Sequence, residues 1–328
     1  MSGAMHIPRE EGRVVALCGG VGGAKLAFGL QKVLGSKLHV VINMADDFEH
    51  LGLHISPDLD TVLYTLGGLN DRQRGWGRAD ESWNFMEAIG QIGGETWFAL
   101  GDRDLALHVE RTRRLANGES LTQIVQDIAR NFGITAHLWP VTDDPVRTVV
   151  VTPEEELAFQ RYFVALRCEP AVRAIRFDGA ESARLAKGVR DALQSEGLRM
   201  IIICPSNPFL SIDPILAAPG LREALRAADV PIVAVSPLVA GQAVKGPTRK
   251  IMDELQVEAT TASIAAHYGD LIDGLVIDVG DVAEGAALSV AVHAAPTLMT
   301  DDESKIELAR NVLAFGDALA RTARKETR

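Results

Sequence analysis

The feature that most constrains this chain is a short apolar segment that runs directly into a glycine-rich turn. Residues Val14–Cys18 have the composition of a buried strand, and four of the next five positions are glycine. A helix-favouring segment follows from Ala24 to Leu34. A strand, a turn and a helix in this order bring backbone N–H groups and the positive end of a helix to one point, which suits a phosphate group. We therefore expect phosphate binding at the four glycines, with a turn that binds nothing as the alternative; they are Gly19, Gly20, Gly22 and Gly23.

The glycine-rich turn matches neither of the two common phosphate-binding motifs. A Walker A loop needs Gly-Lys-Ser/Thr, whereas Lys25 follows Ala24 and precedes Leu26. The dinucleotide fingerprint needs a third glycine at the position of Lys25 if Gly20 and Gly22 are the first two. The turn therefore predicts a phosphate group, but not which ligand carries it.

Strand-like and helix-like segments alternate along the rest of the chain, which is typical of a mostly parallel sheet with helices on both faces. Buried strands are expected at 38–44, 200–204, 231–235 and 275–279, and further strands at 136–139, 148–152 and 172–177. We predict a three-layer, Rossmann-like α/β fold with one continuous sheet, formed by residues 1–66 and 136–328. Residues 67–135 contain three expected helices and form a largely helical insertion; these helices are 83–89, 104–115 and 121–132.

Composition excludes several classes of protein. The net charge of −11 over 328 residues argues against nucleic acid as a partner, because binding to phosphate backbones needs a basic face. The three cysteines have no paired spacing, which fits a reduced compartment. No apolar stretch reaches the length that spans a membrane. We expect a cytoplasmic protein with no membrane contact.

Acidic residues follow the second expected strand and recur shortly after it. Asp46 and Asp47 lie at its carboxyl end, where ligands bind in open α/β sheets. An acid there would bind a dinucleotide ribose, or would join Asp58 and Asp60 in holding Mg²⁺, which prefers oxygen ligands. A third interpretation is structural: Pro57 and its neighbours form a turn, and Asp60 is the N-cap of a helix that begins at Thr61.

Other strand ends carry polar groups that could reach the same site. Ser206 and Asn207 follow the apolar strand 200–204, and Ser236 follows the strand 231–235. Lys245 lies between Gly241 and Gly246 in a later loop, where it would either contact a phosphate or be solvated. Three of the four tryptophans, among them Trp76, fall in the insertion, where they form either the core of a lid or a platform for a flat ring.

Taken together, these segments resemble the 2-phospho-L-lactate transferase / phosphoenolpyruvate transferase family of coenzyme F-420 biosynthesis. The resemblance extends from Val14 to Pro247. It is carried by the glycine turn 19–25, by Asn43–Asp47, by Ser56–Thr61, by Trp76-Gly77 with Gly101-Asp102, and by Ser206–Pro208.

The resemblance implies a Mg²⁺-dependent transferase. Such an enzyme moves a phospholactyl or phosphoenolpyruvyl group from a guanosine diphosphate-activated donor to the terminal hydroxyl of the deazaflavin Fo, and releases GMP. Asp46 and Asp60 would then face the reacting phosphate and the metal, while the glycine turn, Ser206, Asn207 and Lys245 would hold the guanosine diphosphate. The tryptophan-rich insertion would cover the deazaflavin, and the enzyme would be a homodimer. The remaining expected ligand-binding residues are Lys25, Asp47, Asp58, Thr61, Trp76 and Ser236.

Two other functions fit parts of the pattern. A related glycine-loop family binds nucleotide-sugars and regulates metabolism, and it has no need of a deazaflavin platform. The second alternative function is that of an NAD-dependent oxidoreductase, although the third glycine of the dinucleotide fingerprint is missing. The sequence does not distinguish a lactyl from an enolpyruvyl donor, because both offer the same carboxylate.

Overall fold

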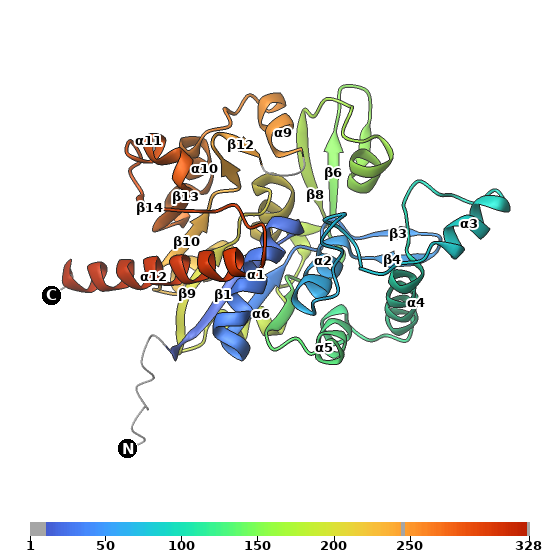
Figure 1. Ribbon diagram of the computed structural model, residues 1–328, viewed down its shortest axis with the longest axis horizontal. Helices are drawn as coiled ribbons and strands as arrows, with labels where there is room; N and C mark the ends of the chain where they lie inside the picture. Colours follow the sequence, from blue (N-terminus) through green and yellow to red (C-terminus); the bar gives the residue numbers. More distant parts are fainter. Residues whose placement is uncertain (1–10, 244–246, 327–328) are drawn as a thin grey trace, which may run out of the picture.

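The computed structural model describes residues 11–243 and 247–326, and its centre is a seven-stranded parallel sheet (Figure 1). The strand order is β14-β13-β10-β9-β1-β2-β5, and every neighbouring pair is parallel. The bounds are β1 Arg13–Cys18, β2 Leu38–Ile42, β5 His137–Pro140, β9 Leu198–Ile203, β10 Ile232–Val235, β13 Gly274–Asp278 and β14 Ala291–Ala295. Strands β1, β2, β9, β10 and β13 consist almost entirely of buried residues, as a sheet covered on both faces requires.

Helices cover both faces of this sheet because the chain leaves its centre in two directions. Helix α1 (Gly20–Leu34) connects β1 to β2, whereas α8 (Leu221–Ala227) connects β9 to β10 on the other side of β1. Right-handed crossovers in opposite directions place these two helices on opposite faces. The long helix α12 (Asp302–Glu326) packs against α1, where a Cβ at Gly29 would collide with the backbone carbonyl of Lys305. Glycine at position 29 therefore permits this close crossing.

The remaining elements are a hairpin, a second sheet and further helices. A hairpin of β3 (Phe48–His50) and β4 (Leu53–Ile55) precedes α2 (Pro57–Leu66), and an antiparallel sheet is made of β6 (Arg147–Val151), β7 (Glu156–Ala158) and β8 (Ala174–Asp178). The segment 67–135 contains α3 (Asn84–Gln91), α4 (Asp102–Ala116) and α5 (Leu121–Asn131). The others are α6 Lys187–Leu193, α7 Asp213–Leu216, α9 Thr248–Glu254, α10 Thr261–Tyr268, α11 Val282–Gly285, β11 Leu238–Val239 and β12 Gln242–Ala243.

The predicted fold class, a Rossmann-like α/β sheet with helices around it, is confirmed. The prediction of one continuous sheet is wrong, because the strands expected at 148–152 and 172–177 pair with each other in the separate antiparallel sheet. The helix expected to begin at Thr61 begins at Pro57, so Asp58 and Asp60 lie in its first turn and Ser56, not Asp60, is its N-cap residue. Strand β14 and the β3–β4 hairpin were not predicted.

The chain moves toward one edge of the sheet after β1 and toward the other edge after β9, and this divergence determines where the site lies. From β1 the chain proceeds to β2, and from the neighbouring β9 it proceeds to β10. The loops that leave the carboxyl ends of β1 and β9 therefore diverge, and a crevice opens between them. Among the described residues, no helix is both long enough and apolar enough to cross a membrane.

Candidate active site

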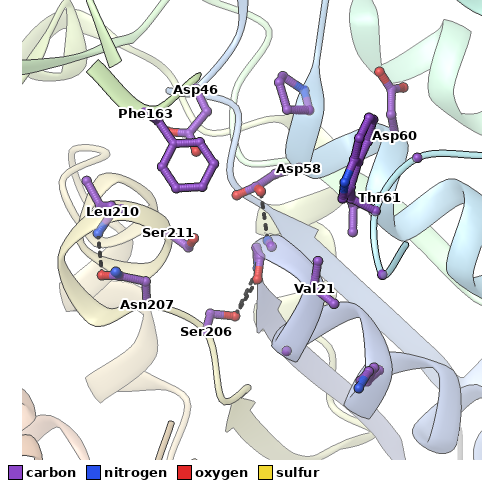
Figure 2. A pocket seen from close by; sticks show the side chains of 18 of the residues that line it. Val21, Asp46, Asp58, Asp60, Thr61, Phe163, Ser206, Asn207, Leu210 and Ser211 are labelled. Atoms are coloured by element: carbon purple, nitrogen blue, oxygen red, sulfur yellow. Dashed lines mark hydrogen bonds between the residues drawn. The ribbon is translucent and has the colours of Figure 1, made fainter. Parts of the chain in front are cut away.

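A cavity of about 670 Å³ lies at the carboxyl ends of the central strands (Figure 2). The loops after β1, β2, β9 and β10 all reach it, so the four strand ends singled out in the sequence meet at one place. The cavity is lined by twelve of the residues expected to bind ligands or metal: Gly19, Gly20, Gly22, Lys25, Asp46, Asp58, Asp60, Thr61, Trp76, Ser206, Asn207 and Ser236. Gly23 and Asp47 do not line it, and Lys245 lies outside the described residues.

The glycine segment is the first turn of α1 and not a loop that precedes the helix. Gly19 is the N-cap residue, and Gly20 has a φ of 61°, a conformation that favours glycine. The N–H of Gly20 donates to Oδ1 of Asp58 at 2.8 Å. A Cβ at Gly22 would collide with the carbonyl oxygen of Pro205, and one at Gly23 with the Ser206 hydroxyl. Packing between the loops that follow β1 and β9 therefore explains two of the glycines without a ligand.

Ser206 and Asn207 hold the loop after β9 in place. The Ser206 hydroxyl donates to the carbonyl of Gly19 at 2.7 Å and accepts from the Gly19 N–H at 3.1 Å, so it ties this loop to the glycine turn. Oδ1 of Asn207 accepts from the N–H groups of Phe209 and Leu210, and its Nδ2 donates to Thr248 Oγ1 at 3.0 Å. Both side chains line the cavity, but their main hydrogen bonds organise its wall.

Two buried carboxylates, Asp46 and Asp58, face the cavity near the start of α1 (Figure 2). Asp58 accepts from Gly20 N–H and from Asn43 Nδ2 at 2.9 Å, and Thr148 Oγ1 donates to Asp46 at 3.3 Å. Burial raises the pKa of Asp58 to about 6. Burial, followed by repulsion from Asp58, raises the pKa of Asp46 well above its ordinary range. Each carboxyl group therefore resists ionisation unless positive charge enters the cavity.

Asp60 points in a different direction, toward α4 (Figure 2). Its carboxylate accepts two hydrogen bonds from Arg111, a side chain with no exposed surface, and His108 Nδ1 lies 3.7 Å from Asp60 Oδ2. His108 Nε2 is 3.2 Å from Asp104, which also accepts from the Tyr64 hydroxyl at 2.5 Å. Asp60 thus has a basic partner that its sequence neighbourhood did not reveal, and the two helices α2 and α4 are joined by buried charges.

The other expected residues have specific roles around the cavity. Asp47 accepts from the Ser56 hydroxyl at 2.7 Å and lies 3.0 Å from His54 Nε2, so it supports the hairpin and the start of α2. Lys25 Nζ donates to the carbonyl of Met299 at 2.7 Å, and the Ser236 hydroxyl accepts from Leu238 N–H at 3.2 Å. Each of these groups is part of the protein's own hydrogen-bonding network.

Aromatic side chains form two walls of the cavity. Trp76, Trp97 and Phe98 come from the segment 67–135, and Trp76 and Trp97 keep 49% and 36% of their surface exposed. A later segment of the chain supplies Phe159 and Phe163, whose rings stack with their centroids 5.3 Å apart. Exposed rings that line a cavity suit a flat, partly apolar ligand.

Sequence reasoning missed the buried network on α4 and the second aromatic pair. Asp104, His108 and Arg111 are spaced four and three residues apart, so they share one helix face. A polar stripe on the face that packs against the protein was the available signal. Phe159 and Phe163 gave no comparable signal, because nothing in their segment marks it as near the glycine turn.

Comparisons with known proteins identify the family of the chain. The family model of 2-phospho-L-lactate transferase CofD matches residues 14–314. The chain is 42% identical over 316 residues to a phosphoenolpyruvate transferase of Kitasatospora aureofaciens, with 93% of this chain and 98% of that protein covered. It is 37% identical over 324 residues to a phosphoenolpyruvate transferase of Mycobacterium bovis, with 91% and 97% covered.

The fold also has solved counterparts. A member of the UPF0052 family from Bacillus halodurans superposes with a TM-score of 0.60 at 15% identity, over 92% of this chain and 98% of that one. This likeness shows a shared fold alone. The fold and the family match together define an α/β transferase. The chain belongs to the 2-phospho-L-lactate transferase CofD family, as the sequence motifs predicted.

Proposed function

We propose that this transferase moves a phosphoenolpyruvyl group from a guanosine diphosphate-activated donor to the terminal hydroxyl of the deazaflavin Fo, in the synthesis of coenzyme F-420. GMP is the leaving group. The enolpyruvyl donor is preferred to the lactyl donor because the curated relatives at 36–42% identity over most of the chain carry the name phosphoenolpyruvate transferase. We also propose that the enzyme is a homodimer and works in the cytoplasm.

One observation carries the proposal: a single cavity joins the first turn of a helix, buried carboxylates and exposed aromatic rings. The helix start offers a favourable field for a diphosphate, and the rings offer a surface for a flat heterocycle. Such a transfer depends on positioning and charge neutralisation more than on a protein nucleophile. The lining of the cavity offers groups for both requirements.

The donor set fits Mg²⁺. Asp46 and Asp58 are hard oxygen ligands, both are buried, and the groups that donate to them are neutral. Burial raises the pKa of both groups, and a bound dication beside them would favour their ionised forms. Asp60 is already paired with Arg111, so we propose Asp46 and Asp58 as the direct ligands and Asp60 as a nearby charge. Bound Mg²⁺ would offset the charge on the donor phosphates.

The chain's own residues would then align the acceptor. The aromatic wall of the segment 67–135 holds the ring system of Fo, and the ribityl chain reaches toward the start of α1. The carboxylate of Asp46, which lines the cavity beside Asp58, would receive the proton of the attacking hydroxyl. The glycine turn keeps side chains away from the diphosphate.

The test is incubation of the purified enzyme with Fo, Mg²⁺ and each of the two donors, followed by mass spectrometry of the product. We expect dehydro-F-420-0 from the enolpyruvyl donor, and no product when a chelator is in excess while the far-ultraviolet circular dichroism is unchanged. Full turnover in the chelator would exclude the metal. The binding of Fo can be measured by the quenching of its own fluorescence. An enzyme that binds NADH but does not bind Fo would instead be an oxidoreductase.

A further inference from the structure

A second, smaller cavity of about 80 Å³ adjoins the main one. The two cavities share six lining residues, among them Val21, Lys25, Thr61 and Trp76, so they are neighbours across the first turns of α1 and α2. The loop that carries Trp76 separates them, and both residues that flank Trp76 are glycines with positive φ. The small cavity is therefore a side pocket of the active site.

The side pocket has two basic side chains that do not line the main cavity, Arg72 and Lys305, and it shares Lys25 with that cavity. Within the described residues, the main cavity is lined by four aspartates, and its basic lining side chains are Lys25 and His108. A ligand that carries several negative charges would therefore find its most favourable electrostatic position at this end.

The positive charges are only partly compensated by the protein. Arg72 and Lys305 share one carboxylate, Asp302, at 2.8 and 2.9 Å. Asp71, which also lines the side pocket, is paired with Arg74 at 2.9 Å. Only 6% of the Lys305 side chain is exposed, and its ammonium also lies 4.8 Å from the centre of the Phe28 ring. A buried ammonium in a cavity that has room for a small group favours an anionic ligand.

We propose that this side pocket binds the carboxylate of the three-carbon acid on the donor, with Arg72, Lys305 and Lys25 as its recognition residues. The inference rests on the proposed function, which supplies a donor with a carboxylate a few bonds from its diphosphate. The volume suits a small acid and not a nucleotide base. Thr61 and Thr65 line the same pocket, and their hydroxyls would complete the hydrogen bonds to the acid. This site makes the enzyme selective for carboxylated donors over plain guanosine diphosphate.

The test compares the binding of the donor with that of GDP, which lacks the acid, by calorimetry with Mg²⁺ and without Fo. For Arg72→Met we expect the donor to bind roughly tenfold or more weakly, because a charge-assisted contact is lost, while GDP affinity changes less than about twofold. Arg72 is 59% exposed, so the variant should fold; Lys305→Met is the second, more buried variant. Lys32→Met is the matched control, because Lys32 also stacks on Phe28 but lines neither cavity.

A donor analogue with a carboxamide in place of the carboxylate completes the cycle. Wild-type enzyme should bind it about as weakly as Arg72→Met binds the natural donor, and Arg72→Met should weaken it little further. Equal loss of GDP and donor would assign the pocket to the diphosphate and overturn the inference. Unchanged donor affinity in both variants would overturn it as well. If wild-type enzyme binds neither GDP nor donor, the proposed function itself fails.

Discussion

Arg111 and Asp60 form a buried, bidentate ion pair that joins α4 to α2 at the edge of the candidate active-site cavity. Arg111 also donates to the carbonyl of His54 in the β3–β4 hairpin. One guanidinium group therefore connects the segment 67–135, the hairpin and the helix that carries the acidic motif. Arg111, although distant from the glycine turn in sequence, therefore holds the cavity-lining residue Asp60 in place.

We expect Arg111→Met to destabilise the protein by about 3–5 kcal/mol, because Asp60 would remain as a buried charge without its partner. The free energy of unfolding in urea measures this. Arg113→Met on the same helix is the control: its pair with Glu110 is exposed and should contribute less than about 1 kcal/mol. The double variant Asp60→Leu/Arg111→Met should regain part of the loss. Equal effects at positions 111 and 113 would contradict the role of the buried pair.

The glycine turn gives a prediction about packing. We expect Gly22→Ala to destabilise the protein by about 1–3 kcal/mol, because the added Cβ meets the carbonyl of Pro205. In Gly20→Ala the nearest atom is Ser211 Oγ at 3.8 Å, so only the positive φ opposes the change, at a cost of about 1 kcal/mol. Thermal unfolding without ligands ranks the two variants. A larger loss at position 20 would show that strain, and not packing, requires glycine here.

The free energy of unfolding should depend on pH through the carboxyl group of Asp58. Its pKa is about 6 in the folded protein, above its ordinary value of 3.8, so folding favours the protonated form. The stability that this group contributes is therefore complete below about pH 4 and is lost as the pH rises through about 6. Without divalent metal, wild-type enzyme should lose stability over this range, and Asp58→Asn should flatten the change. A profile that is the same in both proteins would refute the shift.

The sequence predicted the central architecture because its signals are local. The segment 14–34 carries an apolar run and glycines that identify a strand, a turn and a helix, and residues 200–204 form a continuous apolar run that identifies a central strand. Strand β14 escaped prediction because Ala291–Ala295 is rich in alanine and partly exposed. The strands predicted at 148–152 and 172–177 were assigned to the wrong sheet, because the pairing partners of a strand are not encoded in its own residues.

The candidate site was predictable where residues follow strand ends, and not where distant helices meet. Asp46, Ser206 and Ser236 could be placed together because parallel strands end at one edge. The pair between Asp60 and Arg111 spans 51 positions, and no local pattern connects them. The structure gives a second reason for two of the glycines. Gly22 and Gly23 pack closely against another loop of the protein, and a sequence alone cannot distinguish this packing from contact with a ligand.

The sharpest prediction separates the two neighbouring aspartates after β2. Asp46 lines the cavity, whereas Asp47 is held by Ser56 and His54 outside it. We expect Asp46→Asn to lower kcat a few hundred-fold, equivalent to about 3–4 kcal/mol, because the charge acts mainly in the transition state. The affinities for Fo and GDP should remain within a few-fold of wild type. Asp47→Asn should instead reduce the free energy of unfolding and change kcat much less.

Measurement of kcat, both ligand affinities and urea unfolding on the two purified variants checks this prediction. If Asp46 bound a dinucleotide ribose, its substitution would weaken ligand binding and leave the chemical step nearly unchanged. A near-normal kcat for Asp46→Asn would remove this residue from the mechanism. Mg²⁺ adds a second readout: at a hundred times its dissociation constant it should stabilise wild-type enzyme by about 2.7 kcal/mol, and this gain should shrink in Asp46→Asn but persist in Asp47→Asn. The two adjacent carboxylates would then differ in function because only one of them faces the cavity.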